Sequence, residues 1–347
     1  MAEGSGSERD RAIGALAGLA LGDALGMPTQ SMSRAAIAVR YGRVTTLRAG
    51  APDQPIAPGL PAGTVTDDTE QALLLAHLLI DGKGVVDAPA FAAALDAWEQ
   101  DMIRRGSQDL LGPSTKRAIQ RLHDGESPAE SGRDGTTNGA AMRVAPVGIA
   151  FPATDPAALL DAVVAASRVT HNTGLGIAGA AAVAAAVSAG IDGAALPDAL
   201  DAAEQAAEQG AQRGHWVAGG DIAARIRWAR RWVRGMGPAA LADAVADVIG
   251  TSVASQESVV AAFAIAEAMG DDPLGALTLA AGIGGDTDTV AAMCGAVLGA
   301  QHGVGGLPAD QLGIVRRVNR LDLEPVVDGL LALRSPALRS QTLRSRT

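Results

Sequence analysis

Apolar residues recur at three- and four-residue spacing along nearly the whole chain, and this periodicity constrains the fold more than any other feature. Alanine and glycine dominate, only 2% of residues are aromatic, and runs of β-branched residues are short. This mixture favours helices that pack closely through small side chains over a sheet. No two segments show the alternation expected of paired strands, and no fixed-period repeat is present. The sequence therefore predicts an all-α protein.

Glycine, proline, aspartate and threonine interrupt the periodic pattern and set the expected helix boundaries. No long Ser/Gly/Pro linker divides the 347 residues, so we expect one domain over residues 9–333, with disordered termini at 1–8 and 334–347. The proline- and glycine-rich segment 42–63 is expected to form a long functional loop. The expected helices cover about 9–25, 67–80, 88–104, 113–123, 139–150, 156–170, 173–189, 195–209, 219–235, 238–249, 255–269, 272–281, 287–301, 308–319 and 323–333.

Charge and composition limit the possible binding partners and the cellular compartment of the protein. The formal net charge of −10 argues against nucleic acid or an anionic membrane surface as the main partner. The single cysteine, Cys294, lies in an apolar helical stretch, which predicts an inert buried thiol and a reducing compartment. The apolar run 176–190 is expected to be a buried helix, too short and too weakly apolar to cross ~30 Å of hydrocarbon. With no secretion signal at the N-terminus, these features predict a soluble cytoplasmic protein with no membrane partner.

The first acidic motif is in the segment GTVTDDTEQALLL, where Thr66, Asp67 and Asp68 stand at the expected start of an apolar helix. One side chain is enough to cap a helix, and the helix dipole tolerates a second acid in the first turn. Taken by itself, this motif is typical of a solvated helix start.

A second acidic motif follows three glycines in AAGIGGDTDTVAAM, again at the expected start of an apolar helix. Residues two apart on a helix point about 200° away from each other. Asp286 and Asp288 can therefore face one target only if Asp286 precedes the helix, on the glycine-rich turn. Thr289 then joins the same face, three residues after Asp286.

The two motifs together offer four carboxylates and two hydroxyls. Four clustered negative charges repel one another unless cations neutralise them, and two divalent ions balance four carboxylates. An all-oxygen set of ligands selects hard ions such as Mg²⁺ or Mn²⁺ over Zn²⁺. The pair of motifs therefore predicts a binuclear metal site, with two independent helix caps as the alternative.

Five segments resemble, in the same order, the ADP-ribosylglycohydrolases. This family contains dinitrogenase-reductase-activating glycohydrolase and the ADP-ribosylarginine and ADP-ribosylserine hydrolases. The resemblance spans roughly Arg11 to Gly305 and is carried by LAGLALGDALGMPTQ, GTVTDDTEQAL, TTNGAAMRVAPVGIA, SRVTHNTGLGIAGA and GIGGDTDTVAAMCGAVLGA. It implies a compact orthogonal bundle of about 13–16 helices, with two Mg²⁺ or Mn²⁺ ions at the bottom of a cleft.

The resemblance also implies roles for single residues. The metal ligands it implies are Thr66, Asp67, Asp68, Asp286, Asp288 and Thr289. Asp67, Asp68 and Asp288 are catalytic candidates, because a carboxylate with a free oxygen can orient the attacking water. The substrate-binding candidates are Gln30, Thr137, Asn138, Gly139, His171, Gly284 and Gly285. Without the family, Asn138 and Gly139 are equally an ordinary turn signal, and His171 a capping or turn residue.

Gln30 departs from the family pattern. Many relatives have a glutamate seven residues after the aspartate of the GD block, and in this chain that place, counted from Asp23, holds Gln30. An amide can position water or substrate but cannot take a proton at neutral pH. Either a metal-bound hydroxide does this work, or another acid such as Glu257 substitutes.

The expected function is cleavage of the glycosidic bond of an ADP-ribosyl group carried by a protein or a small molecule. Two alternatives stay open at this stage. One is a metal-dependent N-glycoside hydrolase of a nucleoside-like molecule, and the other is an ADP-ribose-binding protein with impaired catalysis. The sequence sets neither the group that carries the ADP-ribose nor the oligomeric state.

Overall fold

The computed structural model describes residues 7–107 and 111–334, which form 17 α-helices and no β-strand. The all-α prediction is confirmed. The helices are α1 (Glu8–Gly26), α2 (Arg34–Tyr41), α3 (Asp67–Asp81), α4 (Ala88–Arg104), α5 (Pro113–His123), α6 (Gly139–Met142), α7 (Ala145–Ala150), α8 (Pro156–His171), α9 (Gly174–Ile191), α10 (Leu196–Gly210), α11 (Ile222–Val233), α12 (Pro238–Ala244), α13 (Ser255–Met269), α14 (Pro273–Ala280), α15 (Thr287–His302), α16 (Ala309–Asn319) and α17 (Leu323–Arg334). A π-helical turn, Val245–Ile249, extends α12.

Helices α1 and α15 pack antiparallel, with their backbones in direct contact. The residues of α1 at this contact are glycines four apart: Gly14, Gly18, Gly22 and Gly26. A Cβ atom on Gly22 would lie 2.1 Å from the carbonyl oxygen of Ala291, and one on Gly26 would lie 2.3 Å from the Cα of Asp288. Only glycine allows so close an approach. The pairing places the end of α1, and Gln30 just beyond it, beside the start of α15.

Helix α9 lies inside the bundle. By length and composition it could cross a membrane, but 94% of its apolar window is buried within the fold. Its burial, not the shortness expected from the sequence, therefore distinguishes it from a membrane span. It belongs to a hydrophobic cluster that extends from Ala12 near the N-terminus to Leu333 near the C-terminus.

Two helix predictions were wrong in detail. Helix α2 was not expected, because Ile37 is its only buried residue and leaves little apolar periodicity to detect. The single helix expected at 139–150 is two, α6 and α7, separated by Arg143 and Val144. Pro146 has no N–H to donate to the carbonyl of Met142, so one continuous helix is disfavoured at this point.

The folded part extends slightly beyond the expected 9–333. The Ser7 side chain accepts a hydrogen bond from the backbone N–H of Asp10 and caps α1, which begins at Glu8. Arg334, expected in a disordered tail, ends α17 with its side chain buried. The rest of both predicted tails, 1–6 and 335–347, lies outside the described residues.

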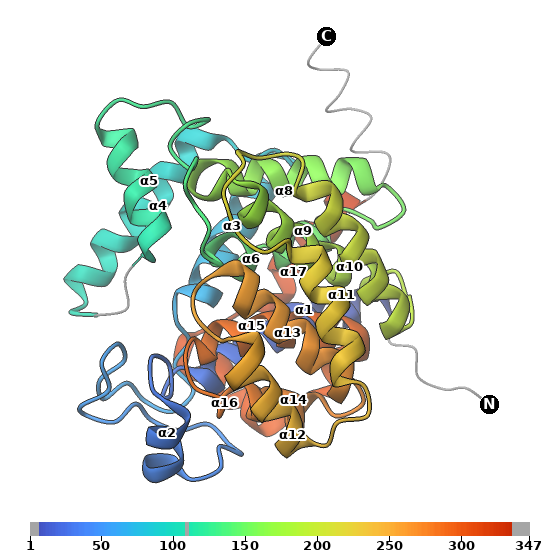
Figure 1. Cartoon of the computed structure of the whole chain (residues 1–347). Coiled ribbons are helices and arrows are strands. Elements are labelled where there is room, and N and C mark those ends of the chain that lie inside the picture. Colours follow the sequence, from blue (N-terminus) through green and yellow to red (C-terminus); the bar gives the residue numbers. More distant parts are fainter. Residues whose placement is uncertain (1–6, 108–110, 335–347) are drawn as a thin grey trace.

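Figure 1 shows which elements surround the centre of the molecule. Helices α4 and α5 project on the same side as α2 and the loop that follows it, while α3, α6 and α15 lie at the base between them. The first residues of α3, α6 and α15 are parts of the motifs singled out in the sequence.

Candidate functional site

A cavity of about 280 Å³ lies where the starts of α3, α5, α6 and α15 meet. Its lining includes the sequence-predicted residues Gln30, Asp67, Thr137, Asn138, Gly139, Asp286, Asp288 and Thr289. The two acidic motifs, far apart in sequence, are therefore brought to one place. Their roles in binding and catalysis stay predictions.

Asp68 joins the two motifs. It is completely buried, and the hydroxyl oxygens of Thr66 and Thr289 both lie 3.3 Å from its Oδ2. Its other oxygen, Oδ1, is buried without a hydrogen-bond partner. Burial raises the pKa of Asp68 well above its usual value, and the carboxylates of Asp67 and Asp288 raise it further. The acidic side chains of the two motifs are therefore close enough to raise each other's pKa.

Asp23, for which no role was predicted, anchors the start of α3. Its carboxylate accepts hydrogen bonds from the backbone N–H and the hydroxyl of both Thr66 and Thr69, at 2.5–3.1 Å. Burial raises the pKa of Asp23 to about 6, although these four hydrogen bonds favour the ionised form. The anchor fixes the backbone from which Asp67 and Asp68 project. No local pattern indicates it, because donors and acceptor lie more than 40 residues apart.

The glycine-rich turn places Asp286 before α15, as the spacing required. Gly284 and Gly285 have φ angles of +86° and +79°, and a Cβ atom on Gly285 would lie 2.4 Å from the carbonyl oxygen of Thr251. Gly285 also pairs with the segment after Gln30: Ser31 N–H donates to its carbonyl at 2.8 Å. Gly284 and Gly285 thus shape the backbone around Asp286 and are not among the described residues that line the cavity.

Asn138 and Asp286, which both line the cavity, are in direct contact. Its Nδ2 donates to Oδ2 of Asp286 at 2.5 Å and to the hydroxyl of Ser258 at 3.0 Å. Burial raises the pKa of Asp286, whereas the hydrogen bond from Asn138 lowers it. Asn138, predicted to bind substrate, therefore also orients one of the predicted metal ligands.

The loop 42–63 forms part of the cavity wall next to Gln30. Nε2 of Gln54 donates to the carbonyl oxygen of Gln30 at 2.8 Å, and Ile56 lines the cavity. Gln30 is only 6% exposed, and its Nε2 has no hydrogen-bond acceptor. Lys116 lines the cavity from α5, and its ammonium lies 3.4 Å from Oε1 of Glu99 on α4.

Two candidates lie elsewhere than the sequence suggested. His171 is fully buried behind the cavity wall, and its Nε2 lies 2.9 Å from the hydroxyl of Thr137, which does line the cavity. It can thus reach a ligand only through Thr137. Glu257 is not among the lining residues, and its Oε2 accepts the backbone N–H of Ser252 at 3.1 Å. This contact indicates that Glu257 orders the loop before α13. It gives no support to Glu257 as a substitute acid.

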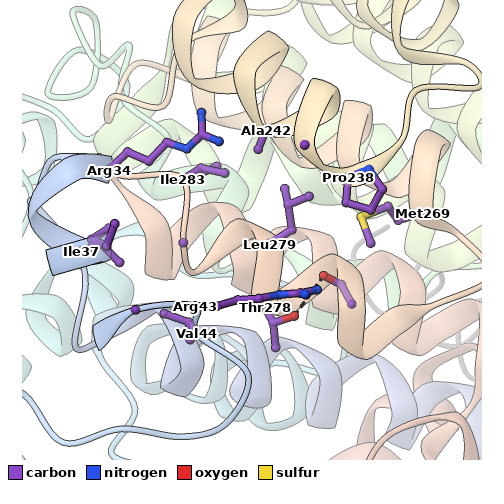
Figure 2. A pocket seen from close by; sticks show the side chains of 15 residues that line it. Arg34, Ile37, Arg43, Val44, Pro238, Ala242, Met269, Thr278, Leu279 and Ile283 are labelled. Atoms are coloured by element: carbon purple, nitrogen blue, oxygen red, sulfur yellow. Dashed lines mark hydrogen bonds between the residues drawn. The ribbon is translucent and has the colours of Figure 1, made fainter. Parts of the chain in front are cut away.

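A second cavity, of about 520 Å³, lies between α2, α12 and α14 (Figure 2). Ile37, Leu279 and Ile283 give it apolar walls, and Arg34 at its edge is paired with Asp243 at 2.5 Å. No carboxylate is among the described residues that line it. The predicted metal ligands lie instead at the first cavity, of about 280 Å³, which we call the smaller cavity.

The described residues that line the smaller cavity have the right chemistry for a divalent cation, but they do not form a closed set of ligands around one point. Asp67, Asp286, Asp288 and Thr289 are among the residues that line this cavity, and carboxylate and hydroxyl oxygens suit hard cations. A cation would also balance the charge that raises the pKa of Asp68 and give its buried Oδ1 a partner. Within residues 7–107 and 111–334, no three Asp, Glu, His or Cys side chains converge on one point.

Comparison with known proteins identifies relatives over almost the whole chain. The profile of a family described as ADP-ribosylglycohydrolase matches residues 5–339. An uncharacterized protein of Escherichia coli K12, YegU, is 34% identical over 326 residues, which cover 94% of this chain and 97% of that protein. A solved structure described as an ADP-ribosylglycohydrolase-related protein complex superposes with a TM-score of 0.69 at 26% identity and covers 95% of this chain and 99% of its own.

Two relatives with named activities match about half of the chain. The ADP-ribosyl-[dinitrogen reductase] glycohydrolase of Rhodospirillum rubrum is 35% identical over 167 residues, 48% of this chain and 53% of that protein. The ADP-ribosylarginine hydrolase Tri1 of Pseudomonas putida GB-1 is 32% identical over 176 residues, 47% of this chain and 42% of that protein.

Proposed function

Because this chain belongs to the ADP-ribosylglycohydrolase family, we propose that it hydrolyses the glycosidic bond between an ADP-ribosyl group and a protein side chain or small molecule, using two Mg²⁺ or Mn²⁺ ions. One observation carries the proposal: Asp68 is contacted by hydroxyls from both acidic motifs beside a single cavity. The named activities of the bacterial relatives agree with this substrate class.

In this proposal the acidic residues hold the cations and orient water. The oxygens of the two motifs, Thr66–Asp68 and Asp286–Thr289, would hold the ions. A divalent cation bound there supplies Lewis-acid chemistry that stabilises developing charge and makes a nearby water easier to deprotonate. A carboxylate oxygen that is not occupied by a cation accepts a proton from the attacking water and orients that water toward the anomeric carbon. Lys116 would contribute positive charge toward the diphosphate in the same cavity, although Glu99 at 3.4 Å partly neutralises it.

Gln30 supports a specific alternative, an ADP-ribose-binding protein with little or no turnover. Its amide lines the cavity but cannot remove a proton from water. The Gln30→Glu variant separates the two cases. If Gln30 has replaced a catalytic base, the variant will release ADP-ribose faster than the wild type from at least one substrate. If no substrate is cleaved faster, loss of a base does not explain Gln30.

The proposal is tested with a substrate panel of ADP-ribosyl-arginine, ADP-ribosyl-serine and simple nucleosides, each with Mg²⁺, Mn²⁺ or EDTA. We expect ADP-ribose release from at least one ADP-ribosyl substrate, abolished by EDTA and by Asp288→Asn. The exposed Asp271→Asn provides the control, because Asp271 lies outside the cavity. ADP-ribose binding without release from any substrate would instead establish the binding protein. Equal cleavage of nucleosides lacking the adenylate half would establish the N-glycoside hydrolase.

A further inference from the structure

Arg143 is the largest fully buried side chain in the described part of the chain, and it lies at the break between α6 and α7. Its guanidinium stacks 4.9 Å from the centroid of the Phe91 ring. Within residues 7–107 and 111–334 its guanidinium donates to the neutral side chains of Gln71 and Thr170 rather than to a carboxylate. A buried cation without such a partner costs stability, so its position needs an explanation other than packing.

One end of the guanidinium reaches the acidic wall of the cavity through Gln71. Nη1 of Arg143 donates to Oε1 of Gln71 at 3.0 Å, and Nε2 of Gln71 donates to Oδ2 of Asp67 at 3.0 Å. Because a guanidinium can only donate, Gln71 must turn its oxygen to Arg143 and its NH₂ group to Asp67. The carboxylate of Asp67 is thereby held in one orientation, with Oδ2 engaged from behind.

The other end reaches Thr137, another residue that lines the cavity, through Thr170 and His171. Nη2 of Arg143 donates to the hydroxyl oxygen of Thr170 at 2.5 Å, and that hydroxyl lies 2.7 Å from Nδ1 of His171. Since Thr170 accepts from Arg143, its own proton is available for Nδ1. Burial, reinforced by the positive charges of Arg143 and Arg117, holds the pKa of His171 well below its usual value, so the ring is neutral. When Thr170 donates to Nδ1, the single ring proton of His171 lies on Nε2.

The tautomer of His171 decides what Thr137 offers to a ligand. With the proton on Nε2, His171 donates to the Thr137 hydroxyl at 2.9 Å. The hydroxyl proton of Thr137 is then not needed by His171 and can be donated to an acceptor oxygen in the cavity, which Thr137 lines. With the opposite tautomer, Thr137 would donate to His171 and would present only an acceptor to the ligand.

We propose that Arg143 is a positioning residue for two residues that line the cavity: it orients Asp67 through Gln71, and through Thr170 and His171 it makes the Thr137 hydroxyl a hydrogen-bond donor to the ligand. The metal-dependent half of this proposal rests on the proposed function. The half that concerns His171 does not, because the tautomer exists in the free protein.

The His171 half is tested by ¹⁵N NMR of histidine-labelled protein, with His171→Gln used to assign one signal set among the five histidines. We expect the Nε2–H tautomer in the wild type and in Thr170→Ser, which keeps the hydroxyl. Thr170→Val and Arg143→Met should show a mixture of tautomers and bind ADP-ribose roughly five- to tenfold more weakly, the usual effect of one lost hydrogen bond. An Nδ1–H wild type, or an unchanged tautomer in Thr170→Val, overturns this half even if Arg143→Met fails to fold.

The Asp67 half is tested by calorimetric titration of the metal-free protein with Mn²⁺. Gln71→Met should bind Mn²⁺ about 10–100-fold more weakly than the wild type, as is typical when a group that orients a metal ligand is lost. Gln311→Met is the control, because Gln311 is a similarly buried glutamine on α16 outside this network. Equal Mn²⁺ affinity in the wild type and Gln71→Met overturns this half. A wild type that binds no Mn²⁺ contradicts the proposed function, and the NMR result alone then decides the proposal.

Discussion

Replacing Gly22 by alanine should destabilise the protein, although alanine is the better helix former. In an exposed helix interior the change would stabilise by about 0.5–1 kcal/mol. Here the new Cβ atom would lie 2.1 Å from the carbonyl oxygen of Ala291, and ordinary contact begins at 3.4 Å, so α1 and α15 must separate locally by about 1.3 Å. Both contacting groups are backbone and cannot rotate away. Overpacking of this kind costs about 1–3 kcal/mol or more, and we place Gly22→Ala at the upper end.

The net loss expected for Gly22→Ala is therefore about 2 kcal/mol, measured as the free energy of unfolding in urea. Gly313→Ala is the matched control within a helix, since among the described residues its Cβ atom would meet the flexible end of Arg317, at 3.2 Å. That variant should be stabilised by about 0.5–1 kcal/mol. The close packing of α1 on α15 would be refuted if both variants were stabilised equally.

Three further changes test other parts of the structure. At neutral pH, Asp68→Asn should raise the unfolding free energy of the metal-free protein by about 1 kcal/mol or more, the equivalent of one pKa unit, because burial and the neighbouring carboxylates disfavour the charged form of Asp68. The variant should also lose stabilisation by Mn²⁺, and a less stable metal-free variant would contradict this reasoning. Burial raises the pKa of Cys294 from 9.0 to about 12, so iodoacetamide at pH 8 should label the native thiol about a thousandfold more slowly than the unfolded one, and comparable rates would show that it is accessible. Arg334→Met should lower the unfolding free energy in urea by about 3 kcal/mol, because the guanidinium satisfies buried carbonyls of Gly148 and Ser188; a change below about 1 kcal/mol would contradict that role.

The sequence predicted those features that are encoded by local residues at the start of one helix. The starts of α3 at Asp67 and α15 at Thr287 were expected within a residue, because acids, glycines and the apolar pattern that follows are all local signals. The position of Asp286 ahead of its helix followed from side-chain directions alone. The meeting of the two motifs was inferred from charge balance, and the contact of Thr289 with Asp68 supports that inference.

Features that depend on tertiary contacts could not be predicted in this way. The histidine at 171 has the same local sequence whether it faces a ligand or lies behind Thr137, and only the packing of α8 decides this. In the sequence, Asp23 is a single acid near the end of an apolar helix. Its role depends on hydrogen bonds from Thr66 and Thr69, which only the tertiary structure brings to it. The burial of Arg143 is hidden for the same reason, since its partners come from α3 and α8. The cytoplasmic location stays a prediction.

The measurement that tests the central claim most directly is the anomalous scattering of manganese in crystals of the wild-type protein soaked in millimolar MnCl₂. Our account predicts two manganese peaks in the smaller cavity, with oxygens of Asp67 or Asp68 and of Asp286 or Asp288 as ligands. A cavity without a manganese peak, or a peak held by only one of the two motifs, would contradict it.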